Sequence, residues 1–305
     1  MLSFSLLIIY GNFEKRIISN MKIPFLYLTV FFVSSLHAQY YYNDIVGTNE
    51  TNRQMSTYNQ QFVKTVSATG YDANGSKATD FSEFYEVKEQ GKALKVTSIT
   101  NQNKSIMYSV FDGNGRVIKM IDSFSVIQNN TSYEYNTSGN IYKIENVVID
   151  SANAFNQVET HIWLYNTNGR PEKMWRIVKQ TGAENSIDSL EIRFVADEKG
   201  NIIEERSFKK GVETNFLYYY YDDENRMTDI VRYNKKLEKL IPDIMFEYDD
   251  SNRVIQKITT TSDRVIAYLI WRYIFNDKGL KTKEALFDND KKLKGKIDYS
   301  YTFFK

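Results

Sequence analysis

The sequence predicts an all-β protein built from repeated antiparallel β-hairpins that form an elongated, twisted or spirally wound sheet. Two observations lead to this prediction. A short turn motif, clearest in residues 246–255, recurs along the chain, and the residues before each turn alternate with the period of two that is typical of strands. The composition agrees, because 3 prolines in 305 residues and 15% aromatic residues suit continuous sheet.

The motif consists of an aromatic residue, Asp or Asn, two variable residues, Gly or Asn, a basic or amide residue, and an aliphatic residue. Residues 111–117 are a full copy, 71–75 are an early partial copy, and 196–202 keep the turn without the aromatic residue. The Gly or Asn falls at 115, 139, 169, 200, 225, 252 and 279, a repeat of 24 to 31 residues. Asp or Asn can accept a backbone amide two residues on, while Gly and Asn tolerate positive φ, so tight hairpins are expected.

The strands that lead into the turns have one apolar face. Counting back in steps of two gives Tyr135 and Tyr133; Tyr165, Trp163 and His161; Tyr221, Tyr219 and Leu217; Tyr248, Phe246 and Ile244; and Phe275, Tyr273, Trp271 and Leu269. The outgoing strands 117–121 and 141–144 have apolar residues on both parities. That pattern leaves two interpretations open, a bulge after the turn or burial on both faces.

The repeated motif resembles the YD repeat of Rhs-like bacterial exported proteins, over about residues 105–305 and in the manner of a short Bacteroidetes-type member. The resemblance implies antiparallel hairpins joined into long, spirally wound sheets. The chain lacks the cargo domain and the obvious autoproteolytic aspartate pair of the large Rhs toxins. A small stand-alone sheet is therefore expected rather than a sealed shell around a toxin.

The N-terminal region predicts export. Met21 and Lys22 precede an apolar run at 23–33 and a small residue at Ala38, so we expect translation to start at Met21 and signal peptidase to cut after Ala38. The run is shorter than the roughly 20 residues that span a bilayer, and the mature chain is expected to have no transmembrane span. The predicted organisation is a signal peptide region at 1–38, an irregular N-terminal arm with capping strands at 39–100, and hairpin repeats at 101–305.

Within the predicted arm, residues 43–61 are polar without a period, which favours a flexible arm or an irregular cap. Strands are expected at 62–69, 81–87 and 93–99, as an atypical unit that covers the open end of a repeat stack. An outer-membrane barrel is the competing architecture, since the chain ends on alternating aromatic residues. Segments 203–206 and 228–232 argue against it, because their charges leave no face free for lipid.

The composition excludes several classes of site. The chain has no Cys, and 39 basic residues balance 38 acidic ones, so neither a thiolate metal site nor binding to nucleic acid is expected. Cleavage after Ala38 would leave His161 as the one histidine of the mature chain. We interpret it as a core or rim side chain whose hydrogen bonds are satisfied. No phosphate-binding loop is present, and no catalytic residue, metal or cofactor is predicted. The Asp and Asn clusters at 112–114, 222–225, 249–250 and 288–290 suit calcium loops, but turn chemistry already accounts for them.

We therefore predict a non-enzymatic exported protein, in the periplasm, associated with the outer membrane, or secreted. Its expected partner is an envelope or outer-membrane protein complex, in which it acts as an interaction subunit or as an accessory subunit, a plug being one form of the latter. The alternative is a carbohydrate-binding module with exposed Tyr and Trp, and a third, less favoured alternative is a carboxylate glycosidase. The weak binding candidates are Trp163, Trp175 and Trp271; the first and last fall on the buried parity, whereas Trp175 is less determined.

Overall fold

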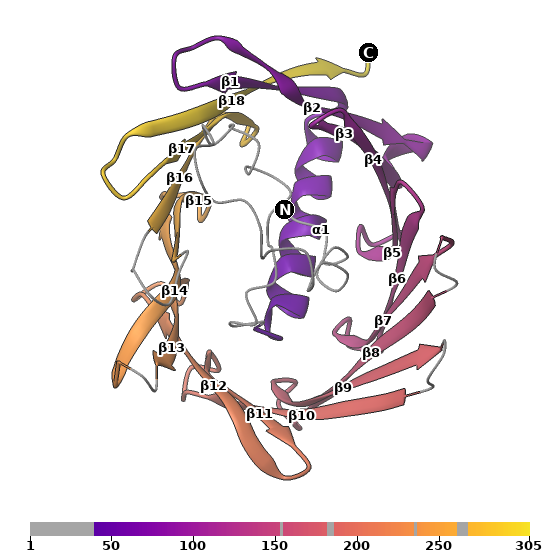
Figure 1. Cartoon of the computed structure of the whole chain (residues 1–305), viewed down its shortest axis with the longest axis vertical. Helices are drawn as coiled ribbons and strands as arrows, with labels where there is room; N and C mark the ends of the chain where they lie inside the picture. Colours follow the sequence, from indigo (N-terminus) through magenta and orange to yellow (C-terminus); the bar gives the residue numbers. More distant parts are fainter. Residues whose placement is uncertain (1–39, 153–154, 182–185, 235–236, 261–267) are drawn as a thin grey trace.

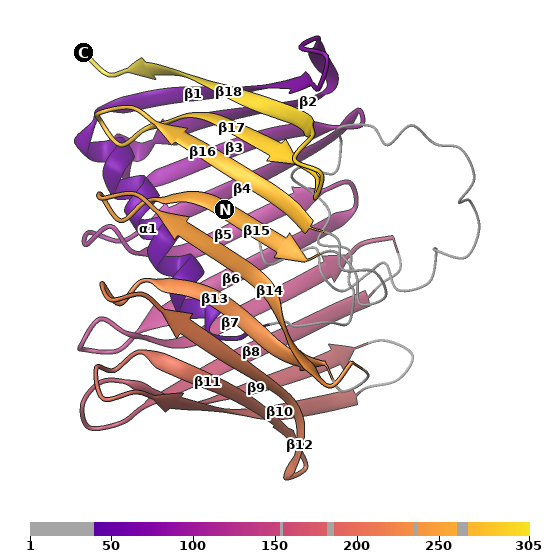
Figure 2. The same cartoon turned by 90° about the vertical axis from the view of Figure 1, so that its left-hand side faces the viewer.

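The computed structural model describes residues 40–152, 155–181, 186–234, 237–260 and 268–305. The signal peptide and the start at Met21 lie outside these residues. Within them the chain forms one α-helix, one 3₁₀-helix and 18 strands (Figures 1 and 2). The elements are α1 (Asn43–Gln60), β1 (Val63–Asp72), β2 (Lys77–Lys88), η3 (Glu89–Gly91), β3 (Ala93–Thr100), β4 (Asn103–Phe111), β5 (Val117–Phe124), β6 (Ile127–Tyr135), β7 (Ile141–Asp150), β8 (Phe155–Tyr165), β9 (Pro171–Thr181), β10 (Ser186–Ala196), β11 (Ile202–Lys209), β12 (Val212–Tyr221), β13 (Met227–Asn234), β14 (Lys239–Tyr248), β15 (Val254–Thr260), β16 (Tyr268–Phe275), β17 (Lys281–Phe287) and β18 (Leu293–Phe303).

The strands close into a barrel. Each strand pairs antiparallel with the next one in the sequence, and β18 pairs with β1, with Ala68 opposite Tyr299. The all-β prediction is confirmed, but the expected elongated or spirally wound sheet is wrong, because the sheet closes on itself (Figure 1). Closure pairs the backbone groups of β1 and β18, which an open sheet would leave as two unprotected edges.

The two rims of the barrel differ. The turn rim carries η3 and the repeat turns at 112–116, 136–140, 166–170, 197–201, 222–226, 249–253 and 276–280. The loop rim, at the other end, carries the hairpin connections at 101–102, 125–126, 210–211 and 288–292. The early motif copy at 71–75 also lies at the loop rim, because β1 and β4 run in opposite directions. It is therefore out of phase with the later copies.

The repeat turns have the chemistry that the sequence predicts. Asp112 Oδ1 accepts hydrogen bonds from the backbone amides of Asn114 and Arg116, each at 2.9 Å, and Gly115 has φ +77°. Directly after the turn the register shifts by one residue, so that Ile118 forms a bulge. Equivalent shifts follow the other repeat turns. A bulge, rather than burial on two faces, therefore explains the apolar residues on both parities.

The aromatic and basic residues of the motif join each hairpin to its neighbour. Tyr248 points into the barrel and its hydroxyl donates to the backbone carbonyl of Met227, at the start of the previous hairpin's return strand, at 2.7 Å. Arg226 lies over the Tyr248 ring at 5.2 Å and its Nε donates to Asp222 at 2.7 Å. The hydroxyl contact recurs from Tyr135 to Val117, from Tyr165 to Ile141, from Tyr221 to Ile202 and from Tyr301 to Lys281.

The N-terminal segment differs from its prediction. Residues 43–61 were expected to be a flexible arm or irregular cap, but they form helix α1, which lies inside the barrel (Figure 1). The predicted strands at 62–69, 81–87 and 93–99 correspond to β1, β2 and β3, and they belong to the barrel wall instead of capping a stack. Among the described residues, no helix has the length and hydropathy that crossing a bilayer requires.

Candidate functional site

Helix α1 lies across the opening of the barrel at the turn rim. We centre the candidate site on this helix. It crosses the interior, close to the repeat turns (Figures 1 and 2). Asn52 Oδ1 accepts a hydrogen bond from the backbone amide of Val117 at 2.8 Å, and Arg53 donates to the carbonyl of Asn252 at 3.1 Å. The helix is thus tied to the turn after β4 on one side and to the turn after β14 on the other.

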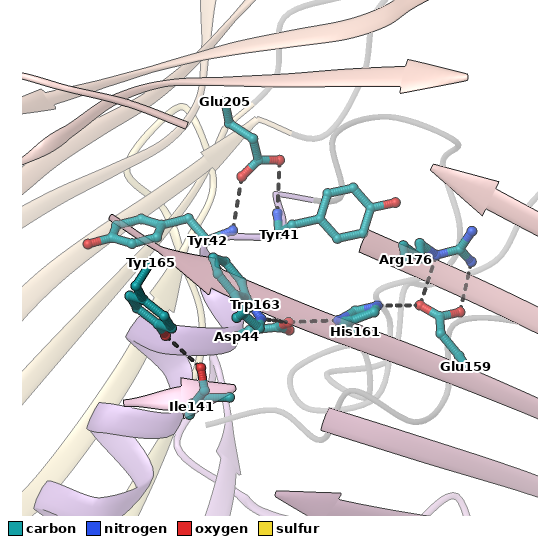
Figure 3. A network of polar contacts seen from close by, with 10 residues as sticks. All are labelled: Tyr41, Tyr42, Asp44, Ile141, Glu159, His161, Trp163, Tyr165, Arg176 and Glu205. Carbon is teal, nitrogen blue, oxygen red and sulfur yellow. Dashed lines mark hydrogen bonds and ion pairs between the residues drawn. The ribbon is translucent and has the colours of Figure 1, made fainter. Parts of the chain in front are cut away.

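Glu205 of β11 holds the residues that lead into the helix. Its two carboxylate oxygens accept the backbone amides of Tyr41 and Tyr42, both at 2.9 Å (Figure 3), and Oε2 also accepts the Tyr219 hydroxyl at 2.6 Å. Glu205 is 1% exposed, and burial raises its pKa to about 7. One buried carboxylate therefore satisfies two backbone donors ahead of the first helical turn, where no side chain of the helix caps them.

A second group of buried polar side chains fixes the first turn of α1. Asp44 Oδ2 accepts from Trp163 Nε1 at 3.0 Å and lies 2.7 Å from His161 Nδ1 (Figure 3). His161 Nε2 is 2.8 Å from Glu159, which receives two hydrogen bonds from Arg176 at 2.9 and 2.7 Å. These side chains alternate in charge from the helix to the wall of β8 and β9, so each buried charge has an opposite neighbour.

The protonation of this group follows from its geometry. Burial alone would lower the pKa of His161, but the carboxylates of Asp44 and Glu159 outweigh it and raise that pKa to about 10. Burial would likewise raise the pKa of Glu159, but hydrogen bonds from His161 and Arg176 lower it to about 2. His161 is therefore a cation at neutral pH and acts as an ionic link. The prediction of a buried, satisfied histidine is confirmed.

The C-terminal half of α1 packs against the opposite wall. Met55 and Tyr58 are buried in an apolar cluster with residues of β1, β3 and β5. Tyr58 meets Tyr301 edge to face at a centroid distance of 6.5 Å, and Asn59 donates to the Gly91 carbonyl at 2.9 Å. Apolar packing and one hydrogen bond thus secure this end of the helix. The N-terminal end combines its buried ionic contacts with a second apolar cluster, in which Tyr41 packs with Trp163 and Phe194.

Two open pockets lie inside the barrel. One, of about 240 Å³, runs beside α1 and is lined by Val46, Asn49, Glu50, Arg53, Tyr248 and Val254. The other, of about 330 Å³, lies farther toward the loop rim and is lined by Gln157, Arg176, Val178, Gln180, Ser186 and Asp188. Asp188 is the one carboxylate that lines the second pocket, and it is ion-paired with Lys209 at 2.9 Å. A carboxylate glycosidase needs two acidic residues that face each other, and the lining residues of this pocket do not include a second one. In the described part of the chain, no three acidic or histidine residues are grouped to hold a metal ion.

The outer wall of the barrel carries charges at mid-height. Glu205 faces inward, so its neighbours Glu204 and Arg206 face outward, where they pair at 2.7 Å. Farther along the wall, Glu191 lies 3.0 Å from Lys173 and 2.7 Å from Arg193. The sequence analysis disfavoured a barrel, and the strands nevertheless form one. The charged residues on which that argument was based do lie on the outer wall.

The three tryptophans occupy different environments. Trp163 is 2% exposed and stacks on Phe194 at a centroid distance of 5.0 Å, and Trp271 is half-buried in an inner apolar cluster with Leu286. Trp175 lies on the outer face, where Lys173 is 5.9 Å from its ring. The buried parity predicted for Trp163 and Trp271 agrees with these positions, and a binding role for any of the three stays a prediction.

Sequence reasoning singled out His161 and Trp163 but missed Asp44, Glu159, Arg176 and Glu205 as their partners. One signal was present for Glu205, because it occupies the inward parity of its strand together with Ser207. A carboxylate on the inner face of a barrel must meet donors there. The identity of those donors, two backbone amides from residues 41 and 42, is visible only once α1 is in place.

Comparisons with known proteins return remote likenesses to solved structures and no sequence relative. No known protein family matches the sequence, and no curated protein does. The chain is similar to the Photorhabdus luminescens Tc holotoxin pore, at 11% identity and TM-score 0.29, with 73% of this chain and 15% of that chain covered. A porin-like protein from Bacteroides uniformis gives 9% identity and TM-score 0.35, with 79% and 98% covered. OprB from Pseudomonas putida gives 10% and 0.26, with 86% and 97% covered.

The toxin chains are much longer than this one, which spans about 15% of their length. The resemblance to YD repeats rests on the turn residues of the sequence, since no family matches. Identities and TM-scores at this level bear on no function. A functional proposal has to come from the residues of the chain itself.

Proposed function

We propose that this protein is a non-enzymatic, exported subunit of a cell-envelope complex and acts there as a plug or rigid accessory body. The observation that carries the proposal is α1, which bars one mouth of the barrel and is tied to opposite walls by Asn52, Arg53 and the buried contacts of Glu205 and Asp44. A barrel with such a helix across its opening suits a rigid binding partner better than an open channel.

Two further features support this proposal. His161, the interior side chain best suited to acid–base chemistry, is engaged in holding α1, because it lies between Asp44 of the helix and Glu159 of the wall. The outer wall places Glu204, Arg206 and other charges at mid-height, where a lipid-facing barrel has an apolar band. Such a wall suits water or a protein surface, in keeping with a periplasmic subunit or one seated in another protein.

The test is affinity purification of the tagged protein from its own cells after gentle solubilisation, with mass spectrometry and quantitation of what accompanies it. We expect one envelope protein in stoichiometric amount. A variant lacking the apolar run at 23–33 is the matched control, and it should stay unexported and lose that companion. If the companion forms a channel, its conductance in a planar bilayer should fall when the purified protein is added. A monomer without a companion would contradict the proposal.

A further inference from the structure

The loop rim, opposite the mouth that α1 bars, exposes large apolar side chains around the barrel. They stand at hairpin tips or at the strand ends next to them, and Ile187 and Val212 keep 73% and 67% of their surface exposed. The principal members are Ile99, Val126, Ile187, Val212, Leu240 and Leu293. Because these residues come from strands between β3 and β18, they form a discontinuous ring instead of a single patch.

Lysines accompany this apolar ring. Among the described residues of the loop rim, the exposed carboxylates are those of Glu213, Glu238 and Asp290, and exposed lysines outnumber them. Lys179 lies directly across the strand pair from Ile187, and Lys210 lies two residues before Val212. The exposed lysines include Lys104, Lys179, Lys210, Lys239, Lys291 and Lys292.

The turn rim has a more even balance of charge. Over its described turns and the adjoining strand ends it exposes lysines and carboxylates in similar numbers. The lysines include Lys64, Lys88, Lys92, Lys199, Lys278 and Lys305, and the carboxylates include Glu89, Glu198, Asp223, Glu224, Asp250 and Asp277. Phe62, Phe303 and Phe304 are exposed there as well, together beside β1 and β18. The basic charge is therefore concentrated at the loop rim, although the net charge of the whole chain is only +1.

We propose that the loop rim docks on an anionic phospholipid membrane surface. The lysines would contact headgroup phosphates while the aliphatic tips reach the boundary with the acyl chains, as side chains of this kind do at membrane interfaces. These side chains stand at the same end of the barrel, so one surface can contact several of them. The inference goes beyond the proposed envelope subunit and does not depend on it.

A second copy of the chain fits this rim less well. Two loop rims face to face would bring two lysine-rich surfaces together, and like charges repel. Stacking of a loop rim on a turn rim would set the lysine-rich rim against one of more even charge. The apolar residues exposed there, Phe62, Phe303 and Phe304, lie together beside β1 and β18 and would cover only part of the ring. An anionic membrane meets both requirements, because it presents phosphate and hydrocarbon at the same surface.

The test is co-sedimentation of the purified protein with vesicles of phosphatidylcholine alone or mixed with phosphatidylglycerol. We expect sedimentation with the mixed vesicles, weakened by added salt. The combined substitutions Lys104→Glu, Lys210→Glu and Lys292→Glu should lower the affinity about tenfold or more. The matched control, with Lys92→Glu, Lys199→Glu and Lys278→Glu, makes the same charge change at the turn rim and should bind like the unaltered protein. Circular dichroism verifies that both variants are folded.

Three results would overturn the proposal. One is the absence of sedimentation with anionic vesicles, and another is an equal loss of binding in the control variant, which would mean that overall charge alone is sensed. The third is sedimentation with membranes from the protein's own cells but not with pure lipid, which would assign the rim to a protein partner. A separate variant with Ile187→Ser and Val212→Ser should bind anionic vesicles more weakly than the unaltered protein; equal binding would remove the apolar part of the proposal.

Discussion

His161 and Glu205 show how single buried groups decide where α1 lies. Each makes its contacts across the barrel interior to residues that precede or begin the helix, and each is almost fully buried. Burying such groups costs free energy unless they have partners, so a wall that contains them favours the conformation in which α1 supplies those partners. The position of the helix is therefore specified by a few polar contacts as well as by apolar packing.

Stability should fall as the pH rises. The pKa of His161 is raised from 6.5 to about 10, so the stabilisation from its charge is complete below pH 6.5 and is lost as the pH rises through 10. The pKa of Glu205 is raised from 4.5 to about 7, so the folded state retains its proton more strongly than the unfolded state between these values, and stability falls there as the pH rises. Denaturant unfolding between about pH 5 and 10 measures both effects.

The variant His161→Gln separates the two groups. It should lower the free energy of unfolding by about 3–5 kcal/mol near neutral pH, because it leaves buried carboxylates with one partner fewer. At alkaline pH, the variant should also not show the fall in unfolding free energy that comes from deprotonation of His161. The fall between pH 4.5 and 7 that comes from Glu205 should remain. Parallel pH profiles for the variant and the unaltered protein would show that His161 is not charged in the folded state.

At the scale of the element, each repeat is a hairpin whose turn does two separate things. Asp or Asn and the Gly or Asn at positive φ form the turn itself, while the preceding aromatic and the following Arg reach the adjacent hairpin. The same short motif therefore fixes both local conformation and the contact between neighbours. Hairpins that lack one member, as the copy at 196–202 lacks the aromatic residue, still form because the turn and the strand alternation persist.

The turn at 112–116 offers a test of the backbone requirement by itself. Gly113 and Gly115 both have open space where a Cβ would stand, but only Gly115, with φ +77°, is in the left-handed region. We expect Gly115→Ala to destabilise the protein by about 1–2 kcal/mol. Gly113→Ala should be neutral or stabilise by up to about 1 kcal/mol, since it restricts the unfolded chain. Equal effects of the two substitutions on thermal unfolding would contradict the assigned turn geometry.

At the scale of the whole molecule, closure between the first and last strands converts a row of hairpins into a barrel. β1 and β18 are paired along most of their length although they are at opposite ends of the described chain. Because α1 immediately precedes β1, closure and the insertion of α1 concern the same end of the chain. An open sheet would leave the helix on an exposed surface, whereas the barrel surrounds it.

A disulfide can test this closure, since the chain has no Cys of its own. Ser67 and Ser300 are paired across β1 and β18 and are separated by 233 residues. The double variant Ser67→Cys with Ser300→Cys should form a disulfide on oxidation and stabilise the protein by up to about 5 kcal/mol. The matched control Thr97→Cys with Ile106→Cys bridges the local β3–β4 hairpin and should add less, about 3 kcal/mol at most. If the first pair stayed reduced while the control pair oxidised, the sheet would be open.

The sequence by itself determined the all-β class, the hairpin turns, their phase from residue 111 onward, and the apolar face of the incoming strands. These features depend on contacts within a few residues, namely a turn side chain with its own backbone and the alternation along one strand. His161 and Trp163 could be placed on the inner face for the same reason. The bulges after the turns remained one of two alternatives, because local composition does not distinguish them from double burial.

Tertiary structure alone decided the closure of the barrel, helix α1 and the partners of the buried charges. The buried positions of α1, at 44, 48, 51, 55 and 58, have helical spacing. Because Asp44, Thr48 and Thr51 are polar, this buried stripe does not show up as an apolar periodicity in the sequence. Asp44 can occupy such a stripe because the opposing wall supplies His161 and Trp163 from a distant strand, and Thr51 donates to the carbonyl of Gly47 in its own helix. Contacts between residues far apart in the sequence leave no periodic signal within either segment, so only the folded barrel reveals them.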